Sequence, residues 1–196
     1  MSVPDRIKVP RLTSRSWVFW STATAVGVVA IAVYYGITQP ENRWLAAVIL
    51  AATAITVLGV ASSRAWIEPA TGTVVRENFW RLRRRAPLRS AKSISLVNNR
   101  AGGLHLGIKH RRTTYVPVLL LTDYVERSQS PEMLRVLADQ IDTHAPSAAP
   151  TAVLLRRQAD FIAAGGAAPD SPLAAMTTRG ALNAAKAGGV HGPSSE

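Results

Sequence analysis

The chain lacks cysteine, has few aromatic side chains and has about half as many acidic as basic residues. Its 196 residues include 0 cysteines, 12 acidic side chains and 23 basic ones, and aromatic residues make up 6%. The absence of cysteine excludes disulfide bonds and thiolate metal sites. A chain of this length has room for one modest domain beside any membrane segment.

Charged side chains are also missing from two long apolar stretches, residues 17–37 and 44–61, which only residues 38–43 separate. A hydrocarbon core about 30 Å thick needs roughly 20 apolar residues in a helix. An ionised side chain at mid-bilayer costs about 3 kcal/mol, so uncharged stretches of this length suit the membrane. The sequence therefore predicts a transmembrane helical hairpin within residues 17–63.

Aromatic residues flank the two stretches, where amphipathic rings suit a headgroup boundary. We expect six of them to be membrane-interface anchors: Trp17, Trp20, Tyr34, Tyr35, Trp44 and Trp66. Basic residues precede and follow the hairpin, whereas its connection carries only Glu41 and Arg43. The positive-inside rule then predicts a multi-pass protein of the cell (inner) membrane, with a basic N-terminus over residues 1–16 and both termini cytoplasmic.

A signal peptide and a pair of buried helices are both poorer fits to the apolar stretches. A cleaved signal peptide would have a shorter apolar region and small residues at its cleavage site, where this chain has Tyr34 and Tyr35, and no second span would follow. Two buried helices of a soluble domain would usually keep a polar stripe.

Residues 64–145 have a different texture, with short β-like runs separated by turn residues. The expected strands cover residues 65–68, 73–82, 93–97, 104–108 and 113–121, and Pro69 to Gly72 form a turn between the first two. A helix follows, with Ser130 as its N-cap and Pro131 at its first position. Its apolar residues have helical spacing and should pack on the sheet: Leu134, Leu137, Ala138 and Ile141.

This order of elements resembles the pleckstrin-homology-like (PH-like) architecture, in which a C-terminal helix closes a bent antiparallel sheet or partly open barrel. The whole layout resembles small bacterial membrane proteins of the actinobacterial type, in which a two-span hairpin precedes a PH-like domain. The resemblance covers residues 17–145 and implies an α+β membrane protein without a catalytic signature. Other small folds that combine β-strands with a helix are the alternatives.

Residues 146–196 form a tail rich in alanine, glycine and proline. A short helix is expected within residues 151–164. Residues 165–196 have too few large apolar side chains to offset the entropy lost on ordering, so they are expected to be disordered unless a partner holds them.

Catalytic and metal-binding patterns are not recognisable in the sequence. There is no phosphate-binding loop, and the four histidines, at positions 105, 110, 144 and 191, lack the helical spacing of a metal site and are expected at the surface. We therefore expect no enzyme activity and no cofactor.

A basic run in the predicted domain is the strongest local feature. Its members are candidate residues for binding a lipid or a partner: Arg81, Arg83, Arg84, Arg85, Arg89 and Lys92. Because the run lies soon after the second stretch, anionic lipid headgroups are the nearest partner, at about 1 kcal/mol for each arginine. A solvated basic flank that only sets topology is the plainer alternative.

These features predict a non-enzymatic membrane protein that presents a cytoplasmic domain for protein interaction, scaffolding or contact with anionic lipid. It would be an accessory subunit of a larger membrane assembly or a homo-oligomer. A membrane-tethered nucleic-acid-binding protein is one alternative, disfavoured because only Trp80 interleaves the basic run. An enzyme of unrecognised type is another.

Overall fold

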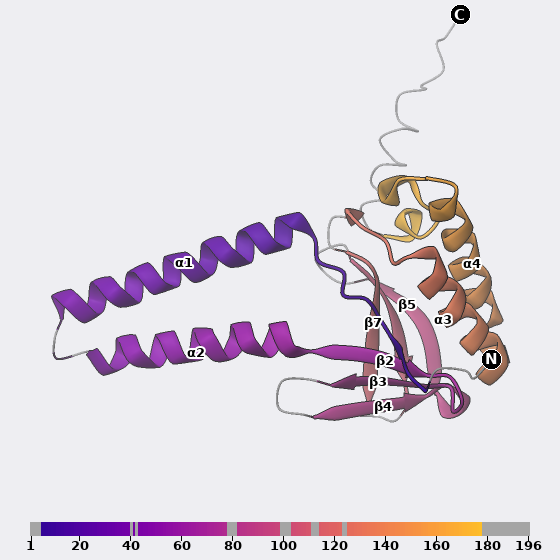
Figure 1. Cartoon of the computed structure of the whole chain (residues 1–196), viewed down its shortest axis with the longest axis horizontal. Helices are drawn as coiled ribbons and strands as arrows, with labels where there is room; N and C mark the ends of the chain where they lie inside the picture. The colour runs from indigo at the N-terminus through magenta and orange to yellow at the C-terminus, as the bar shows by residue number, and fades with distance from the viewer. Residues whose placement is uncertain are drawn as a thin grey trace, which may run out of the picture. The chain divides into compact units, whose positions relative to one another are not determined.

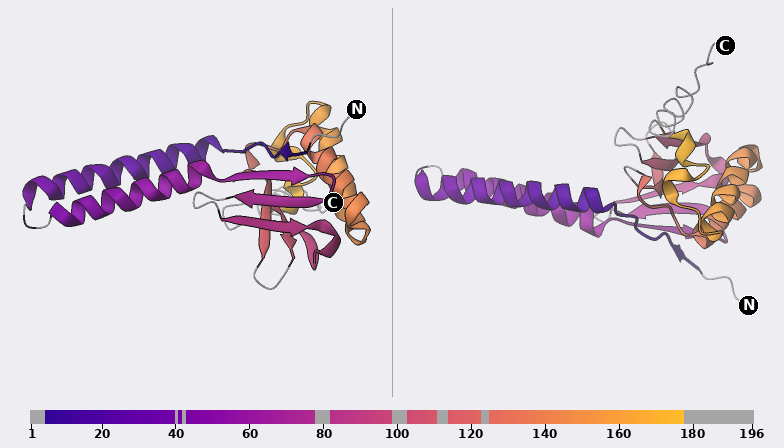
Figure 2. Two further views of the ribbon diagram at one scale, coloured as in Figure 1. Left: turned by 60° about the horizontal axis from the view of Figure 1, so that its bottom comes forward. Right: turned by 90° about the horizontal axis from the view of Figure 1, so that it is seen from above.

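A computed structural model describes residues 5–39, 41, 43–77, 82–98, 103–110, 114–122 and 125–177. The fold is α+β and divides into two compact units (Figures 1 and 2). The helical unit comprises residues 15–64 with residues 77–83. The β unit comprises the remaining segments, at residues 1–14, 65–76 and 84–196.

Two helices, α1 (Arg15–Thr38) and α2 (Arg43–Ser62), pair side by side in the helical unit (Figure 1). Small residues allow the close approach, since Ala32 and Ala46 are buried and a Cβ placed on Gly36 would lie 3.7 Å from the Cβ of Ala46. The Nε–H of Arg43 donates to the carbonyl oxygen of Gly36 over 3.2 Å. It thereby satisfies one of the carbonyls left without a helical partner at the end of α1.

One helix among the described residues, over Val18–Thr38, is long and apolar enough to cross a membrane. The apolar stretch of α2 is shorter, Arg43–Leu58, although the helix itself continues to Ser62.

The β unit contains two antiparallel sheets, although three strand-end residues, Arg64, Glu77 and Arg83, are grouped with the helical unit. The first has four strands in sequential order, β1 (Ile7–Lys8), β2 (Arg64–Glu68), β3 (Thr73–Glu77) and β4 (Arg83–Pro87). The second has three, β5 (Ser93–Asn98), β6 (Leu104–Lys109) and β7 (Tyr115–Leu121). Their inward-facing side chains share one core with α3 (Pro131–His144).

Most expected strands lie within one or two residues of an observed one. The expected strand over residues 73–82 is different, because β3 ends at Glu77 and residues 78–81 lie outside the described part of the chain. The arginine run then forms a strand of its own, β4, with Ala86 buried in the core. Neither β4 nor β1 was expected from the sequence.

Helix α3 has the expected cap and buried face. The N–H of Met133 donates to the Ser130 hydroxyl over 3.3 Å, and Leu134, Leu137, Ala138 and Ile141 are buried. A hydrogen bond to the backbone at Glu132, and then one to Ser130, lowers the pKa of the Glu132 carboxyl. The carboxylate thus suits the N-terminal turn, where helix dipoles favour negative charge.

The short helix expected within residues 151–164 corresponds to α4 (Ala149–Ala163), which adds Ala152, Leu155 and Ala159 to the core. Residues 165–177, expected to be disordered, form short 3₁₀ turns instead, and Leu173 joins the core. The side chain of Gln158 is fully buried, with Nε2 donating to the Ser128 hydroxyl and Oε1 accepting from the N–H of Leu173. Residues 178–196 of the expected tail lie outside the described residues.

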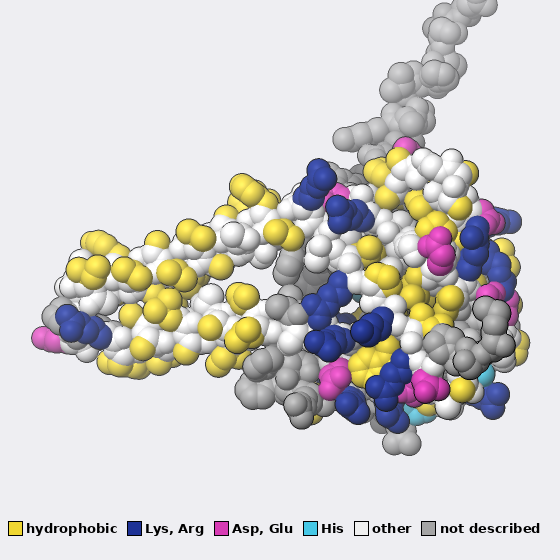
Figure 3. Space-filling view, viewed as in Figure 1, with side chains coloured by type: hydrophobic (Ala, Val, Ile, Leu, Met, Phe, Trp, Pro, Cys, Tyr) yellow, Lys and Arg dark blue, Asp and Glu magenta, His cyan; other side chains and the backbone are white. Residues whose placement is uncertain are grey.

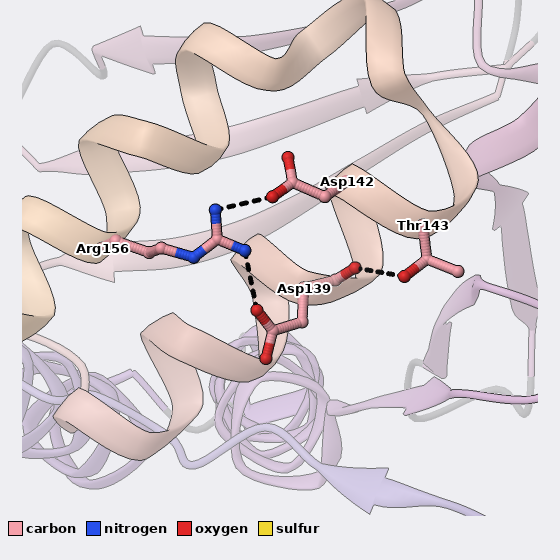
Figure 4. Close-up of polar contacts among 4 residues, drawn as sticks. All are labelled: Asp139, Asp142, Thr143 and Arg156. Atoms are coloured by element: carbon pink, nitrogen blue, oxygen red, sulfur yellow. Dashed lines mark hydrogen bonds and ion pairs between the residues drawn. The ribbon is translucent and has the colours of Figure 1, made fainter.

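Ion pairs link α3 to α4. The guanidinium of Arg156 lies between Asp139 and Asp142, at 2.8 and 2.6 Å (Figure 4). Hydrogen bonds to Asp139 and then Asp142 raise the pKa of Arg156. Arg135 on α3 pairs with Asp160 on α4 over 3.0 Å. All five side chains are solvent-exposed to a large extent, so these pairs fix the helix register more than they add stability.

We predict that Gly72→Ala destabilises the β unit strongly. Gly72 has a φ of 60° in the turn between β2 and β3, and a Cβ there would overlap the ring of His144. Strain and overpacking together should lower the free energy of unfolding by about 2–4 kcal/mol, measured by thermal or urea unfolding in mild detergent.

Gly165→Ala is the matched control, because Gly165 also has a positive φ, 84°, but nothing lies within 4 Å of an added Cβ. The control should cost about 1 kcal/mol from backbone strain alone. Equal losses for the two variants would contradict the packing of His144 on this turn.

Candidate functional site

The helical unit exposes large apolar side chains on several sides of both helices. Figure 3 shows hydrophobic side chains along the visible faces of the two helices, and no charged side chain lies between the ends of either stretch in the sequence. The exposed set includes Val26, Val29, Ile31, Val33, Ile37, Val48, Ile49, Ile55, Val57 and Leu58. An apolar surface of this extent marks a membrane or protein contact, since soluble monomers rarely expose one.

Hydroxyl groups on these helices bond to their own helix. The hydroxyls of Thr38, Thr53, Thr56 and Ser62 each donate to the carbonyl oxygen four residues earlier, over 2.7–2.8 Å. Each such group is therefore satisfied without water, as a lipid environment requires.

Four of the six predicted interface anchors present their rings to the surroundings. The exposed fractions are 64% for Trp20, 66% for Tyr34, 47% for Tyr35 and 62% for Trp44. Tyr34 and Tyr35 lie in the last turns of α1, and Trp44 lies in the first turn of α2. The side chain of Trp17 lies outside the described residues.

Trp66 differs from the other predicted anchors. It lies in β2, is only 7% exposed, and its indole N–H donates to Oε1 of Glu68 over 3.3 Å. The guanidinium of Arg6 lies over the ring, 5.6 Å from its centroid, in a cation–π contact. Trp66 is thus buried within the β unit, unlike the four exposed aromatic residues, and its role as a membrane-interface anchor stays a prediction.

The N-terminal residues belong to the β unit, although helices α1 and α2 separate them from β2 in sequence. We call residues 5–10 the N-terminal clasp. Ile7 pairs with Ile67 and Lys8 with Trp66, and the N–H of Val9 donates to the carbonyl oxygen of Ala65 over 3.0 Å. Nε2 of the fully buried Gln129 donates to the carbonyl oxygen of Pro10 over 2.9 Å. The chain therefore leaves the β unit after the clasp and re-enters it at β2.

Both connections to the helices leave the first sheet at the same end. Strand β2 starts at Arg64, directly after Ser63 and the end of α2, and the clasp runs antiparallel to β2 before the chain enters α1. The opposite end of the sheet carries the turn over residues 69–72. We call these the proximal and distal ends.

The structure separates the predicted basic run into two groups. Arg83, Arg84 and Arg85, the proximal basic group, open β4 and are all exposed. Arg83 pairs with Glu77 over 3.3 Å, and Leu82 beside it is 63% exposed. Arg89 and Lys92 lie past the distal end of β4. Arg81 lies outside the described residues.

Residues from a second loop join Arg89 and Lys92. The N–H of Lys92 donates to the carbonyl oxygen of Lys109 over 2.7 Å, and Nδ1 of His110 lies 3.1 Å from the hydroxyl of Ser90. We call Arg89, Lys92, Lys109 and His110 the distal basic group. The sequence alone does not connect the two loops, because the antiparallel register of β5 and β6 brings them together.

His144 was expected at the surface but is buried, at 8% exposure. The Nε–H of Arg89 donates to its Nδ1 over 3.2 Å, and its Nε2 lies 3.2 Å from the carbonyl oxygen of Pro69. These two contacts define one neutral tautomer, with the hydrogen on Nε2 donating to Pro69. His144 thereby orients the guanidinium of Arg89 and links α3 to the distal turn.

Within the described residues, no group of three or more histidine, cysteine or acidic side chains is arranged to hold a metal ion. The chain matches no protein-family model, no curated protein and no solved structure. The apolar helical surface and the two basic groups are therefore the basis for any functional inference.

We predict that cysteines at positions 9 and 65 form a disulfide in the full-length protein. The sheet register places these residues opposite each other, at a Cα separation of about 5.5 Å, which suits a disulfide. The natural chain contains no cysteine, so the Val9→Cys/Ala65→Cys variant carries no other thiol. Protection from a maleimide–polyethylene glycol conjugate after mild oxidation measures the bond.

The control is Val9→Cys/Glu68→Cys, which moves one thiol three residues along β2, about 10 Å. It should stay reduced under the same oxidation. Equal oxidation of the two pairs, or none of either, would contradict the pairing of the clasp with β2.

Proposed function

We propose that the chain is an integral membrane protein in which α1 and α2 both cross the bilayer. The pairing of the clasp with β2 carries this proposal. Residues 7–8 and 66–67 lie in one sheet, so the segment between them must begin and end in the same compartment. Two crossings satisfy this requirement, which supports a two-span hairpin over a single crossing by α1.

The length of α2 supports the second crossing. Its 20 residues extend about 30 Å, which matches the hydrocarbon core, even though its apolar stretch with described side chains is shorter. The hydroxyls of Thr53 and Thr56 are bonded within the helix, and Arg43 at its start caps α1. These polar groups therefore have partners inside the hairpin and need none from lipid.

The β unit then lies on the cytoplasmic side, by the positive-inside rule. Basic residues flank the hairpin on the side of the β unit, whereas the connection between the helices has one basic residue, Arg43, and one acidic residue, Glu41. We place the protein in the cell membrane of a bacterium on the strength of its resemblance to small bacterial membrane proteins.

We further propose that the β unit is a PH-like module with a non-enzymatic role in protein interaction. Two sequentially ordered sheets of four and three strands followed by α3 support this architecture. The hairpin itself supplies membrane attachment, so the module is free to recruit a partner or to act within a larger membrane assembly. Exposed apolar faces on α1 and α2 are suited to neighbouring spans as well as lipid.

The proximal basic group is proposed to contact anionic headgroups. Three exposed arginines beside the exposed Leu82 combine charge with an apolar side chain that can enter the headgroup layer. The group opens β4 at the proximal end, where the connections to the helices also leave the sheet.

We predict opposite accessibility for cysteines in the helix connection and the β unit. In intact bacterial cells, Glu41→Cys should react with a membrane-impermeant maleimide, because the connection faces outward. Ser95→Cys, on β5, should react only after the membrane is permeabilised. Labelling of Ser95→Cys in intact cells, or recovery of the unmodified chain in the supernatant after ultracentrifugation, would contradict the two-span proposal.

We predict that a photo-crosslinking amino acid at position 82 captures anionic lipid in nanodiscs containing phosphatidylglycerol. The yield should fall severalfold in the Arg83→Gln/Arg84→Gln/Arg85→Gln background, because the cations that hold this edge at the headgroups are absent. Raising the salt concentration should lower the yield as well.

The same photo-crosslinker at the exposed position Ser95 is the control and should capture little lipid. Similar lipid yields from positions 82 and 95 would exclude a specific headgroup contact at the start of β4.

A further inference from the structure

We propose that the distal basic group is a docking surface for an acidic segment of a soluble protein partner. The inference rests on the proposed membrane attachment, and it assigns the partner's chemistry. The distal basic group consists of Arg89, Lys92, Lys109 and His110, which come from two loops. Two contacts hold these loops together, the backbone hydrogen bond between Lys92 and Lys109 and the contact between Ser90 and His110. Arg111 and Arg112 follow directly in the sequence.

The group has no carboxylate partner among the described ion pairs. Glu68, which precedes the distal turn, accepts a hydrogen bond from Trp66, and Asp142, near His144 on α3, pairs with Arg156. Arg89, Lys92 and Lys109 are all exposed. The acidic side chains of neighbouring elements are thus engaged elsewhere, and the three cations are left for an external anion.

Arg89 is held in place for this role. Its Nε–H donates to Nδ1 of His144, a buried acceptor whose other ring nitrogen contacts the carbonyl oxygen of Pro69. The two terminal nitrogens of the guanidinium remain as donors for a carboxylate. An arginine fixed by one hydrogen bond loses less side-chain entropy on binding than a free one.

Position along the sheet favours a soluble partner over lipid. The distal group lies at the end of the first sheet opposite both connections to the helices, and the five residues of β2 extend about 17 Å. That length is about twice the Debye length at physiological ionic strength, so charges at the proximal end and at the distal end serve separate partners.

Nucleic acid is a poorer fit to the group. Proteins that bind single strands combine a basic groove with several aromatic platforms. In the described part of the chain, Tyr115 is the aromatic residue paired in register with Lys109, and its ring already covers Gly107. A cluster of carboxylates needs cations without stacking surfaces, which is what the two loops offer.

The test uses full-length protein in phosphatidylcholine nanodiscs and a fluorescent decapeptide of glutamate, with binding followed by anisotropy at about 0.1 M salt. The wild type should bind, and Arg89→Gln/Lys92→Gln/Lys109→Gln should bind about tenfold more weakly. The matched control, Arg83→Gln/Arg84→Gln/Arg85→Gln, loses the same charge at the other end and should change affinity less than about twofold.

Because Arg89 also bonds to His144, Lys92→Gln/Lys109→Gln is the second variant, and it should weaken binding about threefold without altering the unfolding temperature. Equal losses for the distal and control triples would overturn the proposal, as would tighter binding of a ten-nucleotide DNA strand that depends on the distal residues. Capture of lipid by a photo-crosslinker at position 92 would overturn it too. A failure of the membrane proposal would be detected separately, by ultracentrifugation of the unmodified chain and by maleimide labelling of Ser95→Cys in intact cells.

Discussion

The pairing of β1 with β2 constrains the rest of this molecule. Strand β1 precedes the two helices and β2 follows them, yet the two strands pair in one sheet. The helical hairpin is therefore an insertion in the sequence of the folded β unit. Hydrogen bonds from Val9 and Gln129 hold this pairing at two further points. In the proposed membrane arrangement, a fold closed in this way ties the number of crossings to sheet topology as well as to hydropathy.

The arrangement of charge follows from the same constraint. Strand β4 runs from the proximal end of the first sheet to the distal end. A basic run that is continuous in the sequence is therefore divided between the two ends. Arg83 to Arg85 open β4, while Arg89 and Lys92 meet Lys109 and His110 beyond its other end. A run that is continuous in the sequence thus forms two separate basic surfaces, for which we propose different anionic partners.

Local signals in the sequence predicted the elements that depend on them. Uncharged length predicted α1, the Ser130 cap and apolar spacing predicted α3, and alternation with turn residues predicted β2, β5, β6 and β7. The structural features that the sequence did not predict depend on contacts between residues far apart in the sequence. Strand β1 has two residues and exists only through β2, and the short 3₁₀ turns that follow α4 depend on the contact of Leu173 with the core. His144 is buried because a glycine with positive φ leaves room for its ring.

The clasp also determines what a fragment of this protein would be. Cutting the chain after α2 to obtain the β unit alone removes β1 and leaves the edge of β2, with Trp66 stripped of the Arg6 guanidinium, open to solvent. Bare strand edges of this kind pair with one another, so such a fragment would self-associate. Fusing residues 5–10 to Arg64 through a short glycine–serine loop would instead keep the sheet complete in a water-soluble form.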